Sequence, residues 1–206
     1  DNTGEIEQPT EKPTETPTEP GTETVVTSKD VNVVGYQISS TLKGSRVVAS
    51  VEPTVNGKNV VKHGLVYALT KLGDKDTGVK NIDMTVSADN YYVASFESTN
   101  NGNVDKVFGS SKTAQYYVMT TLFENQTVQE YTAKYKVRAY AVLSDGSYVY
   151  SDIYSYSVYN VASALYDGGK MPTNAGHTYL YDSILKLVNP SYKQVDYDWS
   201  DIVTSL

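Results

Sequence analysis

The 206-residue sequence contains no cysteine, which excludes disulfide bonds and thiol chemistry. Its two histidines, His63 and His177, lie more than a hundred residues apart, and neither HExxH nor GxSxG occurs. No apolar run approaches the roughly 20 residues of a membrane-spanning helix, so we expect no membrane insertion. The first residues lack a basic-then-apolar secretion signal, which indicates a mature chain or a piece of a longer one.

Basic residues are outnumbered, with 17 Lys and Arg against 24 Asp and Glu and a net charge of −7. Most of this charge is local. Residues 1–24 hold seven acidic residues against Lys12, a net −6, which leaves −1 for residues 25–206. Binding of nucleic acid requires a basic surface, so we expect no nucleic-acid partner.

Residues 1–24 also lack apolar side chains, with Ile6 as their one large aliphatic residue, and they hold four of the seven prolines. Such a segment cannot bury enough surface to offset the entropy lost on ordering. We therefore expect a disordered Pro/Thr/Glu linker that leads to a neighbouring module of the same chain.

From Val25 onward the sequence alternates with period two, the pattern of β-strands. The clearest case runs from Tyr131 to Val158, where two alternating arms meet at Asp145-Gly146, a pair suited to a tight turn. This predicts a long hairpin with one buried and one solvated face. The residues expected on the solvated face of its first arm are Lys134, Lys136, Arg138 and Tyr140.

Further strands are predicted at residues 31–41, 46–52, 60–72, 91–97 and 114–123. The run at 60–72 is apolar on both faces, which indicates a central strand. About seven strands with Gly- and Asn-containing turns predict an antiparallel β-sandwich over residues 25–158.

Near Tyr159 the period changes to helical spacing, which predicts a short C-terminal helical appendage from about Asn160 to Asn189. Asn174 is the expected N-cap, and Pro190 ends the run. We expect residues 159–206 to form this appendage and a strap, both packed on the sandwich.

Aromatic residues are unevenly distributed, with 19 Tyr against 3 Phe and 1 Trp. A tyrosine ring is apolar but its hydroxyl stays hydrated, so two interpretations remain open: a tyrosine-rich sheet surface, or a stacking surface for a ligand with apolar faces and hydroxylated edges. The candidate ligand-binding residues are Trp199, Tyr197, Tyr91, Tyr92, Tyr116 and Tyr117.

Two stretches resemble a known family. His63-Gly64-Leu65-Val66-Tyr67 resembles the third-strand signature of bacterial fibronectin type III-like modules, and Tyr135–Ser151 resembles their last hairpin. The resemblance implies an immunoglobulin-like, seven-stranded, two-sheet fold over about residues 31–158. With its linker and tyrosine excess, the chain also resembles the starch-binding modules of cell-surface amylosome proteins of gut ruminococci.

Catalysis and metal binding have weaker support. The four Glu and thirteen Asp after the linker leave a glycosidase-like carboxylate pair possible, but most lie beside turns and strand edges. Asp74–Gly78 is half of a calcium loop without its later glutamate. We expect no enzyme, no cofactor and no metal.

Two functional hypotheses remain. The resemblance implies a non-catalytic carbohydrate-binding module that holds an extracellular, multi-modular protein on starch or maltooligosaccharides. The alternative is a structural spacer or a protein-binding adhesion module in a surface assembly, since no aromatic-plus-amide group with recognisable spacing occurs.

Overall fold

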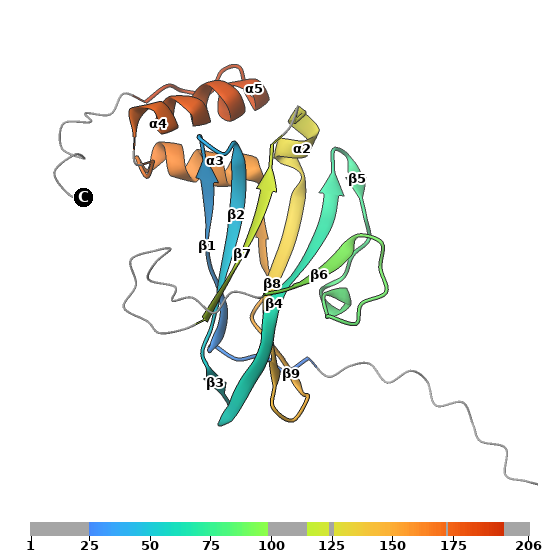
Figure 1. Ribbon diagram of the computed structural model, residues 1–206. Coiled ribbons are helices and arrows are strands. Elements are labelled where there is room, and N and C mark those ends of the chain that lie inside the picture. Colours follow the sequence, from blue (N-terminus) through green and yellow to red (C-terminus); the bar gives the residue numbers. More distant parts are fainter. Residues whose placement is uncertain (1–24, 99–114, 124–125, 172, 196–206) are drawn as a thin grey trace, which may run out of the picture.

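The computed structural model describes residues 25–98, 115–123, 126–171 and 173–195, and for 115–122 it describes the backbone. The predicted linker, residues 1–24, lies outside the described residues. The protein consists mainly of antiparallel β-strands followed by helices (Figure 1). The prediction of a mainly β fold with a C-terminal helical part is confirmed at this level.

The described strands form a three-stranded and a seven-stranded antiparallel sheet, and they curl into a half-barrel (Figure 1). The smaller sheet has the order β1 (Val31–Ser39), β2 (Gly44–Val51) and β7 (Gln115–Leu122). In the larger sheet β4 (Lys58–Leu72) pairs with both β8 (Lys134–Leu143) and β6 (Val93–Glu97). The short strands are β3 (Thr54–Val55), β5 (Lys75–Asp76), β9 (Tyr148–Tyr150) and β10 (Tyr154–Tyr156).

Strand β4 is the predicted central strand, and the apolar residues in its middle, Leu65, Val66 and Ala68, are buried on both faces. Leu65 lies in a cluster with residues of both sheets, among them Val47 and Val137, whereas the next residue, Val66, lies in a second cluster on the opposite face. Gly64 is required by close approach, because a Cβ there would lie 2.0 Å from the carbonyl oxygen of Phe96.

The hairpin turn predicted at Asp145-Gly146 is present, and Gly146 adopts the positive φ of 83° that this turn needs. The first arm, however, begins at Lys134 and not at Tyr131. Tyr131 lies in the short helix α2 (Val128–Thr132), because Thr127 and Glu130 form a capping box that starts a helix there. The other predicted strand ends differ from the structure by one or two residues.

The second arm of the hairpin is broken between Tyr150 and Tyr154, and this break shifts its register by one residue. Tyr150 pairs with Tyr140, whereas Tyr156 pairs with Tyr135. A shift of one residue turns every later side chain to the opposite face. Tyr150 therefore packs beside Val66, while Tyr156 lies in the cluster that contains Leu65.

Ser151 accounts for this break. Its hydroxyl accepts a hydrogen bond from the Ala139 amide at 2.9 Å, in the position where a strand would offer a carbonyl. The carbonyl of Ser151 instead accepts from Nε and Nη2 of Arg138, at 3.1 and 2.8 Å. The Arg138 guanidinium also lies 4.7 Å from the centre of the Tyr150 ring.

The predicted solvated face of the first arm is wrong for two of its four residues. Arg138 and Tyr140 are 4% and 3% exposed, because the segment that carries the fully buried Met84 covers this part of the sheet. Burial lowers the pKa of the Arg138 guanidinium. The sequence did not predict that the segment with Met84 covers the sheet, because Asp74–Asn81 and the residues that follow up to Met84 show no periodic apolar pattern.

The predicted helical appendage is present as α3 (Val158–Asp167), α4 (Asn174–Leu180) and α5 (Lys186–Val188), with a π-helical turn at Tyr181–Leu185. The first helix starts two residues before Asn160, because Ser157 caps it. The predicted N-cap Asn174 is wrong by one residue, since the hydroxyl of Thr173 accepts the Gly176 amide. Leu180, Ile184 and Leu185 are fully buried in a cluster with Ile38 of β1.

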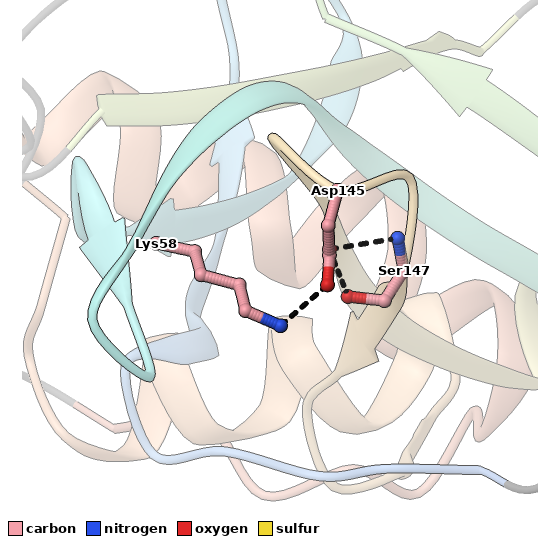
Figure 2. A network of polar contacts seen from close by, with 3 residues as sticks. All are labelled: Lys58, Asp145 and Ser147. Atoms are coloured by element: carbon pink, nitrogen blue, oxygen red, sulfur yellow. Dashed lines mark hydrogen bonds and ion pairs between the residues drawn. The ribbon is translucent and has the colours of Figure 1, made fainter.

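At the end away from the helices, two turns are joined by a polar network (Figure 2). Lys58 follows the Asn56-Gly57 turn, and its ammonium group forms an ion pair with Asp145 of the β8–β9 turn. The Asp145 carboxylate also accepts from the Ser147 amide and hydroxyl at 3.1 and 2.6 Å. The hydrogen bond from Lys58, and then those from Ser147, hold the Asp145 pKa well below its ordinary value of 3.8.

We predict that Ser151→Ala lowers the free energy of unfolding by about 1–3 kcal/mol, because it leaves the buried Ala139 amide without its acceptor. Urea denaturation measures this change. Ser155→Ala removes an exposed hydroxyl from β10 in the same arm and is the matched control. Equal stability of the two variants would contradict the role given to Ser151.

We also predict a pH dependence at the paired turns. The folded-state pKa of Asp145 is depressed, so its contribution to stability is complete above about pH 4 and is lost as pH falls through the folded-state pKa. The stability difference between the wild type and Asp145→Asn should therefore be largest near neutral pH and at low salt. A difference that stayed constant from pH 7 to pH 2, measured by urea midpoints, would contradict this assignment.

Candidate binding surface

The structure describes the side chains of two of the six predicted ligand-binding residues, Tyr91 and Tyr92. Trp199 and Tyr197 lie outside the described residues. Tyr116 and Tyr117 lie in β7, where the backbone pairs them with Ser50 and Ala49 of β2. The structure therefore brings Tyr91 and Tyr92 together and says nothing of how the other four side chains lie.

Tyr91 is 95% exposed, although the backbone around it is well anchored. The Asn90 side chain accepts the Tyr92 amide at 2.9 Å, and the Asn90 carbonyl accepts the Val93 amide at 3.0 Å. The Tyr92 carbonyl accepts the Leu69 amide of β4 at 3.0 Å. These bonds fix the segment that leads into β6 and leave the Tyr91 ring in solvent.

Tyr92 supports the exposed ring from the side. The two ring centres are 5.1 Å apart and the planes meet at 84°, an edge-to-face contact. Lys75 donates a hydrogen bond to the Tyr92 hydroxyl at 3.0 Å, and its ammonium group lies 5.6 Å from the centre of that ring. The hydrogen bond to Tyr92 raises the pKa of Lys75.

This tyrosine pair, Tyr91 and Tyr92 with Lys75 beside them, offers a flat apolar face, a second ring at right angles and a cationic donor. A sugar ring has an apolar C–H face and hydroxyl groups on its edge, so the same arrangement suits stacking of a sugar. Sequence reasoning found the two tyrosines and missed Lys75 and Asn90. Asn90, a turn-forming residue directly before the rings, was the available signal.

Many of the other tyrosines lie in the interior and do not bear on binding. Tyr131, Tyr140, Tyr150, Tyr156 and Tyr166 are buried. A further group, Tyr36, Tyr67 and Tyr135, packs around Tyr156 between the sheets. Burial raises the pKa of Tyr36 to about 12.

A depression of about 530 Å³ lies beside β1 and the start of β10. Its polar groups include Asn32, Asp152 and Tyr154, and the Tyr154 hydroxyl donates to the Asn32 side chain at 2.6 Å. Aromatic, amide and carboxylate groups together are the types that hold sugar hydroxyls. Here, however, two of the groups already bond to each other.

The histidines and the half calcium loop do not form a metal centre among the described residues. Both histidines are buried, and His177 stacks on Tyr166 with ring centres 3.9 Å apart. No group of three His, Asp or Glu that could hold a metal occurs in the described part of the chain. In the half calcium loop, the Asp76 carboxylate accepts the Gly78 amide at 2.7 Å, a bond typical of an ordinary turn.

Comparisons with known proteins show no family. No family model and no curated protein matches the chain. One solved structure with a detectable likeness is a purple acid phosphatase from yellow lupin (Lupinus luteus) seeds, at 9% identity and a TM-score of 0.33. The match covers 78% of this chain and 32% of the phosphatase chain. None of the described helices is long and apolar enough to cross a membrane.

Proposed function

We propose that this chain is a non-catalytic carbohydrate-binding module that binds starch-type α-glucans and their maltooligosaccharides through the tyrosine pair. Its place, on this proposal, is in an extracellular, multi-modular bacterial cell-surface protein, and its strands belong to a fibronectin type III-like sandwich. The observation that carries the binding proposal is the 95% exposure of Tyr91 on an anchored backbone.

An exposed ring on an ordered backbone favours binding, because less conformational freedom is lost when the ligand binds. The loss of backbone and side-chain freedom on binding opposes affinity, and the bonds of Asn90 and Tyr92 have already ordered the segment. Tyrosine has few rotatable bonds for its size, so stacking on it orders little else. The Lys75 donor beside the rings adds a group that can bond a sugar hydroxyl.

The choice of α-glucan over other glycans comes from the resemblance to starch-binding modules. The tyrosine pair is consistent with any glycan that presents an apolar face. Tyr91 is 95% exposed, and an open surface of this kind suits a long or granular polysaccharide better than an enclosed small sugar.

The alternative, a spacer or protein-binding module, also has an observation in its favour. Strand β6 bonds to β4 on one side, and no other described strand pairs with it. Phe96 of this strand is 40% exposed. An edge strand with an exposed aromatic residue is a surface on which a neighbouring module could pair.

We predict that Tyr91→Ala abolishes retention on granular starch, while Tyr91→Phe keeps it because the stacking face remains. Stacking of nucleic-acid bases on aromatic residues is worth about 1–3 kcal/mol per ring, and a loss of about 1.4 kcal/mol weakens binding tenfold. Pull-down with starch, beside cellulose, measures the effect. Tyr148→Ala, at an exposed tyrosine of the β8–β9 hairpin, is the control.

The outcomes separate the hypotheses. A wild-type protein that starch does not retain would favour the spacer. Retention that survives Tyr91→Ala would keep starch binding and move the site to the remaining candidates. Trp199 is the single tryptophan, so its fluorescence during titration with maltoheptaose, together with the variant Trp199→Ala, tests the first of them.

A further inference from the structure

A separate cavity of about 370 Å³ lies between the β1–β2 connection and the segment that joins α3 to α4. In Figure 1 these helices lie across the ends of β1 and β2. The cavity is far in sequence from the tyrosine pair and shares no lining residue with it. Its lining residues are Gln37, Ile38, Ser39, Ser40, Thr41, Arg46, Leu165, Lys170, Met171 and Thr173.

Part of this lining is apolar and firmly packed. Ile38 and Met171 are 6% and 4% exposed, and both belong with Leu165 to the cluster that holds the helices. The backbone of the segment is fixed by a hydrogen bond from the Lys170 amide to the Leu165 carbonyl at 2.9 Å. The cavity therefore has an apolar wall that does not depend on a flexible loop.

The charge of the lining is of one sign. Arg46 and Lys170 are its two charged residues, and none of the ten lining residues is acidic. The ion pairs among the described residues, Lys58–Asp145 and Lys62–Glu97, include neither of them. The nearest acid along the chain, Asp167, accepts a hydrogen bond from the Tyr192 hydroxyl at 2.9 Å.

Two hydroxyl groups of the lining accept backbone hydrogen bonds and keep a hydrogen of their own. Ser39 Oγ accepts the Leu42 amide at 3.1 Å, and Thr173 Oγ1 accepts the Gly176 amide at 3.0 Å. A hydroxyl that accepts from a backbone amide keeps its own hydrogen for a further partner. With the guanidinium and the ammonium group, the lining thus offers positive charge and hydrogen-bond donors beside an apolar wall.

We propose that this cavity binds a small organic anion, a molecule with an apolar body and one carboxylate, phosphate or sulfate group. Arg46 and Lys170 pair with the anionic group, and the hydroxyls of Ser39 and Thr173 donate to it. The apolar body packs against Ile38, Leu165 and Met171. This site is independent of glycan binding, and its ligand links the smaller sheet to the helices.

Benzoate and its neutral analogue benzamide test the proposal, in the absence of any glycan. In two-dimensional amide spectra, benzoate should shift signals of residues 37–46 and 165–173, and benzamide should not. Arg46→Gln and Lys170→Gln should each weaken benzoate binding about tenfold or more, the effect of losing one charge-assisted hydrogen bond. Lys71→Gln, at an exposed lysine of β4 outside the cavity, should bind as the wild type does.

Phenyl phosphate in place of benzoate distinguishes a phosphate-binding from a carboxylate-binding cavity. Equal binding of benzamide and benzoate, unchanged affinity in both variants, or the absence of shifts with either anion would each overturn the proposal. The spectrum of each variant also reports folding. Lys170 is exposed, so Lys170→Gln carries the test if Arg46→Gln does not fold.

Discussion

The hydrogen bond between the Ala139 amide and the Ser151 hydroxyl determines the register in which the last strands, β9 and β10, pair with β8. Because the Ser151 hydroxyl accepts the buried Ala139 amide, the backbone carbonyl of Ser151 is left to accept from the guanidinium of Arg138. A buried arginine without such acceptors would be costly. The resulting shift in register sends Tyr150 to one face of the larger sheet and Tyr156 to the other. The chain then enters α3 directly after β10.

The tyrosines divide into two sets with different physical roles. Inside the protein they fill volume as a phenylalanine would, and the hydroxyl of Tyr150 also has a polar partner, since it accepts the Val86 amide at 3.1 Å. Tyr91, by contrast, lies on the surface with its ring exposed to solvent. Composition counts both sets together, so the excess of tyrosine is a weaker sign of ligand binding than the position of one exposed ring.

The tyrosine pair and the cavity lined by Arg46 and Lys170 lie on different parts of the protein and differ in chemistry. The first is an open surface of two aromatic rings with one lysine donor beside them, on which we propose that a glycan stacks. The second is a recess between sheet and helices whose two charged lining residues, Arg46 and Lys170, are both cationic. Because they share no residue, occupation of one leaves the contacts of the other intact. If both proposals hold, one chain would bind a polymer and a small acidic molecule at the same time.

Period-two alternation, the Asp145-Gly146 turn and the helical spacing after Tyr159 are local signals, and they predicted the order of the long strands and the change to helices from the sequence alone. The short strands β3 and β5 and the helix α2 were not predicted. The same reasoning marked Tyr91 and Tyr92 as adjacent aromatic residues of a strand, whereas the structure places both in the turn before β6. Tertiary structure decided the rest. Periodicity does not fix the one-residue register shift between β9 and β10, and burial of Arg138 depends on a covering segment distant in sequence. The cavity, likewise, joins residues more than a hundred positions apart, and only packing of the helices on β1 brings their charges together.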